Sequence, residues 1–125
     1  MIALIGLLLG VFLGLVFDVN IPESFSPYMS VAILACLDSV FGAFRASLNN
    51  NFKSDIFISG FFGNAILAIL LTVLGEKLNI DIYLAAIVVF VWRMFMNLGI
   101  IRRYYVEKWT LKIKGKKENK REEKE

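Results

Sequence analysis

Residues 56–75 read IFISGFFGNAILAILLTVLG and contain no charged side chain. A helix rises about 1.5 Å per residue, so a helix of this length spans the roughly 30 Å hydrocarbon core of a bilayer. The helices of a soluble bundle need a polar face, and this run offers only Ser59, Asn64 and Thr72. We therefore expect a transmembrane helix, and a soluble helical bundle is the less favoured alternative.

Three other apolar runs accompany this stretch, at residues 2–17, 28–46 and 82–101. Asp38 and Arg45 interrupt the second run and Arg93 the last, while the first is short but uncharged. Only Met1 precedes the first run and no small-residue cleavage site follows it, so we expect a mature helix and not a signal peptide. The sequence thus predicts an all-α membrane protein with short loops and a single four-helix transmembrane domain over residues 1–113.

Positive charge is concentrated at the C-terminal end. From Arg102 onward the chain has ten Lys and Arg against five Asp and Glu, whereas residues 1–101 have four and six. Basic flanks are retained in the cytoplasm, so four crossings place both termini inside and predict a multi-pass protein of the plasma (inner) membrane. A three-span alternative without the second run would place Lys53 outside.

The segment after the last run is expected to sit at the cytoplasmic boundary as a short amphipathic stretch, followed by a disordered tail at residues 114–125. The tail mixes charges and contains no large apolar residue. We expect contact with anionic inner-leaflet lipids and no nucleic acid partner. The expected interface anchors are Arg45, Arg102, Arg103, Lys108 and Trp109.

Small residues recur at helical spacing in the first two runs and predict close helix packing, because lipid tails give helices no hydrophobic drive to associate. The first run carries Gly6, Gly10 and Gly14, and the second carries Ala35, Ser39 and Gly42. We expect these two faces to contact each other within one chain. Contact with another copy of the chain is the alternative.

Polar residues inside the predicted membrane form a candidate site. Counting from the outer helix ends places Asp38 about 15 Å deep and Arg93 about 16 Å deep, with Asn64 at a similar level. Asn97 follows Arg93 by four residues and shares its helix face. An unpaired charge at this depth is costly, so we expect Asp38 and Arg93 to pair. Arg45 is a competing partner, but it lies about 10 Å along the axis and is expected to reach the headgroups.

Composition excludes most catalytic chemistry. The chain has no histidine and one cysteine, Cys36, so His-based catalysis, common zinc sites and an internal disulfide are excluded. Ser39 and Ser59 have no nearby base, and no catalytic, cofactor or metal residues are expected. The polar cluster is interpreted first as a strut that fixes helix packing. A site for an ion, a proton or a substrate group, or recognition of a partner helix, are the alternatives.

Several of these motifs together resemble the small basic protein family of Gram-positive and related bacteria, over nearly the whole chain to about Lys112. The matching segments are Leu37-Asp38-Ser39 with Gly42 and Arg45-Ala46, Ser59-Gly60-Phe61-Phe62 with Asn64, Asp81-Ile82-Tyr83-Leu84-Ala85, and Arg93, Phe95, Asn97, Ile101-Arg102-Arg103 and Lys108-Trp109. The family consists of integral membrane proteins without an assigned activity. Its genes often lie beside cell-division genes, which implies a role in that machinery by association.

These observations predict a small polytopic membrane protein without catalytic activity. Its expected role is that of a structural or interaction subunit of the cell-envelope or cell-division machinery. The expected partners are the lipid bilayer and other membrane proteins or copies of the chain itself. The alternative function is a small transporter or channel-like subunit that uses the intramembrane Asp, Asn and Arg cluster.

Overall fold

A computed structural model describes residues 2–125, and every regular element in this range is helical. The elements are α1 (Ile2–Val16), the short 3-10 helix η1 (Glu23–Phe25), α2 (Ser26–Leu48), α3 (Ser54–Leu78) and α4 (Ile82–Glu122). The all-helical class and the presence of a helix at each of the four apolar runs are therefore confirmed.

The turns that separate the bundle helices follow from their residues. Pro27 lies in the first turn of α2, where a missing backbone N–H costs nothing. Asn79 ends α3 in the left-handed conformation with φ of 52°, and the Ile80 N–H donates to the Gly75 carbonyl at 2.9 Å. A Cβ at Gly75 would lie 2.6 Å from the Ile80 carbonyl oxygen, so the tight α3–α4 turn requires glycine there.

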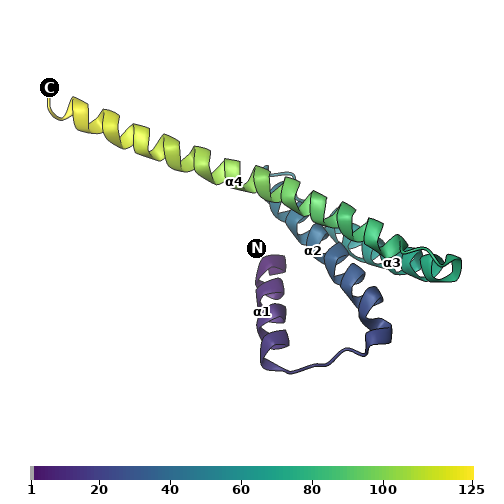
Figure 1. Ribbon diagram of the computed structural model, residues 1–125. Helices are drawn as coiled ribbons and strands as arrows, with labels where there is room; N and C mark the ends of the chain where they lie inside the picture. Colours follow the sequence, from purple (N-terminus) through teal and green to yellow (C-terminus); the bar gives the residue numbers. More distant parts are fainter. Residues whose placement is uncertain (1) are drawn as a thin grey trace.

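Three helices, α2, α3 and α4, form a bundle in which α2 packs against both of the others (Figure 1). The core between them consists of Val31 and Ala35 from α2, Ala68 from α3 and Phe90 from α4. Alanines at two of these positions allow the helix backbones to approach closely, and Phe90 fills the remaining space. The bundle is therefore held by a small apolar core and close backbone packing.

The bundle helices are long and apolar enough to cross a membrane. The apolar spans are 26 residues from η1 through α2, 25 residues in α3, and part of the 41-residue α4. Helix α1 is shorter, because its 15 residues rise only about 22 Å. Three crossings are thus supported by length and composition, whereas a fourth crossing by α1 stays a prediction.

The ends of the bundle differ in charge. Ile2 and Leu4 of α1 line a cavity together with Phe52 and Ser54, so α1 begins near the α2–α3 loop. Helix α4 leaves the bundle on that side, toward Arg102 and Arg103. We call this the basic end, and the opposite end, with Glu23, Glu76 and Asp81, the acidic end.

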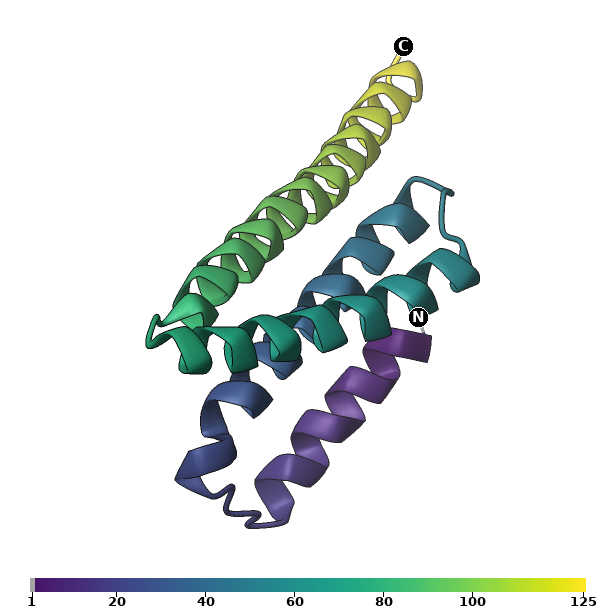
Figure 2. The same ribbon diagram turned by 90° about the vertical axis from the view of Figure 1, so that its right-hand side faces the viewer.

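Helix α1 stands apart from the bundle and contacts α2 alone (Figure 1, Figure 2). Its three glycines, Gly6, Gly10 and Gly14, would each accept a Cβ with nothing within 4 Å. The predicted close seam between the small-residue faces of the first two helices is therefore wrong within this chain.

The reason is that the small face of α2 is already used by the other two helices. Ala35 is fully buried in the core of the bundle, and the Ser39 hydroxyl accepts a hydrogen bond from Asn64 of α3. A Cβ at Gly42 would lie 3.9 Å from the Asn97 side chain of α4. Helix α1 therefore contacts α2 on the side that α3 and α4 leave uncovered.

Helix α4 is longer than the apolar run at residues 82–101 predicted. It continues without a break from Ile82 to Glu122, so a helix end near Ile101, a separate interfacial segment and a disordered tail at residues 114–125 all differ from the structure. Lys, Arg and Glu dominate the tail and are strong helix formers, and no proline interrupts it. The projecting half continues along the α4 axis, beyond the bundle (Figure 1).

Candidate functional site

The inward-facing residues of the bundle form successive layers from the acidic end to the basic end, first an apolar layer and then polar ones. The apolar core of Val31, Ala35, Ala68 and Phe90 forms one layer. One helical turn toward the basic end from Ala35 and Phe90 lie Asp38 on α2 and Arg93 on α4, with Asn64 on α3. Another turn further along lie Gly42 and Asn97, and Arg45 lies about one turn beyond Gly42.

Asp38 and Arg93 form an ion pair, as the depth count predicted. The distance between Arg93 Nη2 and Asp38 Oδ2 is 3.2 Å. The Asp38 side chain is completely covered, whereas the Arg93 side chain is 53% exposed. Neither carboxylate oxygen has a well-oriented hydrogen-bond donor among the described residues, so Asp38 depends on the charge of Arg93. The pair is therefore asymmetric: only one of its members is buried.

The two asparagines of the cluster bind different neighbours. Asn64 Nδ2 donates to the Ser39 hydroxyl at 3.5 Å, which joins α3 to α2. Asn97 is buried, and its Oδ1 accepts a hydrogen bond from Arg45 Nη1 at 3.2 Å, which joins α4 to α2. The predicted cluster is thus divided into three pairwise contacts, each between α2 and another helix.

Arg45 therefore has a role that the sequence analysis did not assign to it. It was expected to reach the headgroups as an anchor, but it also binds Asn97 across the bundle. The other expected anchors, Arg102, Arg103, Lys108 and Trp109, are exposed along α4 beyond the bundle. Lys108 lies over the ring of Tyr104, with its Nζ 4.7 Å from the ring centroid.

Two polar crevices open beside these contacts. The larger has a volume of about 480 Å³ and is lined by Arg45, Arg93 and Asn97, together with Asn49 and Asn51 at the end of α2. The smaller, of about 190 Å³, reaches Asp38 and Asn64 and includes Lys53. The loop residues Asn49, Asn51 and Lys53 were not predicted as site residues, because only the tertiary fold brings the loop next to Arg93.

A further polar contact lies toward the acidic end. The Tyr28 hydroxyl donates to Glu76 and connects α2 to the last turn of α3. Thr72 is buried, and its hydroxyl donates to the Ala68 carbonyl within its own helix. The Tyr28 contact was missed by sequence reasoning, since both residues read as ordinary polar residues near a helix end.

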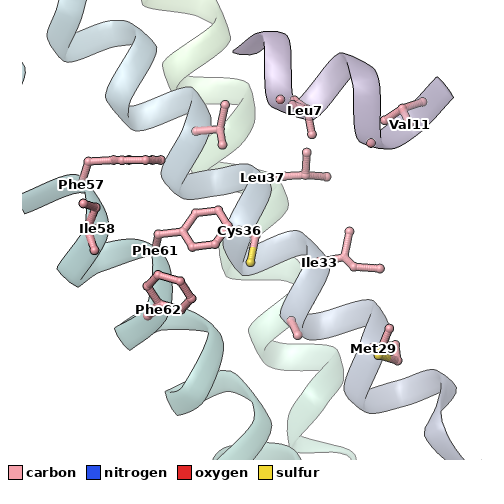
Figure 3. Close-up of a pocket in the computed structure, with 14 residues that line it drawn as sticks. Leu7, Val11, Met29, Ile33, Cys36, Leu37, Phe57, Ile58, Phe61 and Phe62 are labelled. Atoms are coloured by element: carbon pink, nitrogen blue, oxygen red, sulfur yellow. The ribbon is translucent and has the colours of Figure 1, made fainter. Parts of the chain in front are cut away.

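An apolar groove separates α1 from the bundle. It has a volume of about 730 Å³ and lies between Gly6 and Gly10 of α1, the face of α2 around Cys36, and Phe57, Phe61 and Phe62 of α3 (Figure 3). Two of the three α1 glycines that were predicted to meet α2, Gly6 and Gly10, thus lie in one wall of the groove.

The fold and the site define a helical protein with three helices long and apolar enough to cross a membrane and a charge pair held between two of them. Such an arrangement is typical of polytopic membrane proteins. The chain belongs to the family described as "Protein of unknown function (DUF1290)", whose model matches residues 21–106. The matched region contains η1, α2, α3 and the bundle half of α4.

Similar proteins come from two groups of bacteria. The chain is 47% identical over 113 residues to a Bacillus subtilis (strain 168) protein named "Small basic protein", covering 90% of this chain and 93% of that protein. It is 39% identical over 105 residues to uncharacterised proteins of Mycobacterium bovis and Mycobacterium tuberculosis, covering 82% of this chain and 87% of each of theirs. No solved structure matches. The resemblance to small basic proteins is confirmed, and no activity comes with it.

Proposed function

We propose that this protein is a non-catalytic interaction subunit of the cell envelope, and that its apolar groove binds a transmembrane helix of another membrane protein. The observation that carries the proposal is the glycine wall of the groove. Gly6 and Gly10 face a cavity of about 730 Å³ and have nothing within 4 Å of an added Cβ. The groove therefore presents a strip of bare backbone to whatever enters it.

A helix is the occupant that such a wall fits best. Helices in a bilayer associate through close backbone packing, which small residues permit. The opposite wall carries Phe57, Phe61 and Phe62, whose rings offer large apolar contact area. Helix α1 contacts α2 alone, so it can adjust to a guest without disturbing the bundle core.

The proposal also includes a place in the cell envelope and a cytoplasmic position for the basic end. A place in the division or envelope machinery is supported by the family resemblance, and the chemistry of the groove does not bear on it. A cytoplasmic position for the basic end is supported by the concentration of Lys and Arg from Arg102 onward. In this arrangement the projecting half of α4 extends into the cytoplasm.

Photo-crosslinking from the two walls of the groove tests the proposal. A photoreactive residue at Val11 on α1 or at Phe62 on α3 should crosslink in cells to the same transmembrane segment of one partner protein. The matched control is Leu15, which lies on α1 outside the groove and is 82% exposed. Gly10→Leu, which fills the groove, should abolish both crosslinks.

Three results would contradict the proposal. Crosslinks to lipid alone would make the groove an ordinary lipid-facing surface. Crosslinks from Val11 to α3 of the same chain would show that α1 closes onto the bundle. Crosslinks to a second copy would replace the partner protein by self-association.

A small transport subunit is the second candidate, favoured by the crevice that reaches Asp38 from the basic end. Transport also requires access from the acidic end. The apolar layer of Val31, Ala35, Ala68 and Phe90 lies between Asp38 and the acidic end and fills the bundle at that level. Proteoliposomes that show Asp38-dependent ion or proton flux would favour transport over interaction.

A further inference from the structure

The larger polar crevice at the basic end has an unbalanced charge. Its lining contains the guanidinium groups of Arg45 and Arg93 and three side-chain amides, but no carboxylate. Asp38 neutralises part of the Arg93 charge from the adjoining crevice, where Lys53 adds another positive charge. The two crevices together are therefore lined by three cations and one carboxylate, and Arg45, the arginine without an ion-pair partner in residues 2–125, lines the larger one.

Most of the hydrogen-bond donors of these arginines have no partner among the described residues. A guanidinium group has five N–H donors. Arg45 uses one nitrogen to bind Asn97, and Arg93 approaches Asp38 through one nitrogen. Both side chains line a common cavity of about 480 Å³, which is within the size range of small-ligand sites. Two arginine forks and amide groups are the donors that phosphate oxygens prefer.

The position of the crevice along the bundle favours a lipid headgroup over a free phosphate ion. Asn97 lies five residues before Arg102, about 8 Å along the helix, and Arg45 lies three residues from the end of α2. This level adjoins the headgroups of the leaflet at the basic end. Ala46 and Met96 give the crevice apolar lining, and Met96 is half exposed beside it.

We infer that the crevice between α2 and α4 binds the phosphate group of an anionic phospholipid, with Arg45 and Arg93 as the charged ligands and Asn97 as a polar ligand. Basic pockets between transmembrane helices on the cytoplasmic side bind such headgroups. This site is separate from the apolar groove, which lies between α1, α2 and α3, and it does not depend on the proposed partner helix. Lipid bound here would bridge α2 and α4 beside the Arg45–Asn97 contact.

Lipid titration of the purified, delipidated chain tests the inference. Native mass spectrometry should show phosphatidylglycerol bound at one saturable site, with phosphatidylcholine bound about ten-fold more weakly or not at all. Arg45→Gln should weaken phosphatidylglycerol binding about ten-fold, since it removes a charged donor. Lys120→Gln, which removes the same charge from the exposed end of α4, should leave binding unchanged.

A second variant protects the test against misfolding. Asn97→Asp has nearly the same shape as asparagine and still accepts the hydrogen bond from Arg45, so the helix contact survives. It adds a negative charge to the crevice and should also weaken phosphatidylglycerol binding about ten-fold or more. Gly10→Leu in the separate groove should bind phosphatidylglycerol as the parent chain does.

Three outcomes would overturn the inference. Equal phosphatidylglycerol binding by the parent chain, Arg45→Gln and Asn97→Asp would show that the crevice is not the site. Equal affinity for phosphatidylcholine and phosphatidylglycerol would show that the acyl chains determine binding and that the negative charge of the headgroup does not contribute. Displacement of phosphatidylglycerol by millimolar inorganic phosphate, with tighter binding of the free ion, would assign the crevice to a soluble phosphate.

Discussion

Helix α1 is more apolar than the three bundle helices, yet it packs against fewer neighbours. Each bundle helix contributes a polar side chain that binds a neighbour: Asp38 on α2, Asn64 on α3 and Arg93 on α4. Helix α1 has no polar side chain at all between Ile2 and Val16, and it contacts α2 alone. The bundle is fixed by polar contacts and alanine packing, whereas α1 has only its glycines.

The difference agrees with the way in which helices that are apolar enough to cross a membrane choose their neighbours. Lipid tails are as apolar as leucine, so burying an apolar face against another helix gains little. A buried polar group, in contrast, must find a partner, and this requirement fixes which helices are neighbours. The comparison predicts strong effects of substitutions in the bundle and weak effects in α1 and in the projecting half of α4.

The sharpest test of the comparison asks whether α1 crosses a membrane together with the bundle helices, which are long and apolar enough to do so. We expect all-or-none labelling by a membrane-impermeant thiol reagent after Cys36 is replaced by serine. Ser24→Cys should label from outside intact cells, and Ile2→Cys should not, because α1 begins at the basic end. Asn50→Cys and Asn119→Cys should also stay unlabelled and serve as controls. Outside labelling of Ile2→Cys together with Ser24→Cys would mean that α1 does not cross.

The largest effect on stability is expected at the buried ion pair. Arg93→Met leaves the fully buried Asp38 carboxylate without its partner, which should lower the free energy of unfolding by about 3–5 kcal/mol. Asp38→Asn should cost less, because the remaining Arg93 side chain is half exposed. The double variant should recover much of the loss in a detergent unfolding assay. Additive losses in the double variant would show that the two side chains do not interact.

A smaller effect is expected at the α3–α4 turn. Gly75→Ala would bring a Cβ within 2.6 Å of a backbone oxygen, so the turn must shift at a cost of about 1–3 kcal/mol. Gly63→Ala on the same helix and Gly10→Ala on α1 have nothing within 4 Å and are the matched controls. Thermal unfolding in detergent should separate Gly75→Ala from both. Similar melting temperatures for all three variants would contradict the tight turn.

The smallest effect is expected from the end of α4. Residues beyond Tyr105 are exposed throughout, so they contribute nothing to the bundle core. Truncation after Ile113 should change the free energy of unfolding by less than about 0.5 kcal/mol. Circular dichroism of the same truncated chain should lose helical signal in proportion to the removed residues, since the segment is helical. A large loss of stability would mean that the tail folds back onto the bundle.

Much of the fold could be read from local sequence, and the tail shows where such reading fails. Helices α1, α2 and α3 coincide with apolar runs and α4 begins with one, because a run of apolar residues long enough to cross a bilayer has to satisfy its backbone hydrogen bonds internally. The expectation of disorder at residues 114–125 is wrong because a high density of charge does not by itself prevent a helix. The same Lys, Arg and Glu side chains favour a helix once α4 provides a helical start.

The candidate site shows a similar division. The Asp38–Arg93 pair followed from depth alone, since two opposite charges at one level of a membrane are expected to meet. The Arg45–Asn97 contact and the two crevices did not follow, because they depend on the rotation of α2 and α4 about their own axes. That rotation is set by packing around Ala35, Ala68 and Phe90.

The sequence by itself determined the number of helices, the level of each polar residue along its helix and the direction of the charge asymmetry. These quantities depend on residue type and on the rise of a helix, which are local. Only the tertiary structure decided that the small face of α2 packs against α3 and α4, and that Gly6 and Gly10 of α1 face an open groove. Lateral neighbours are non-local, and among helices that are all apolar the polar contacts and small-residue packing choose them.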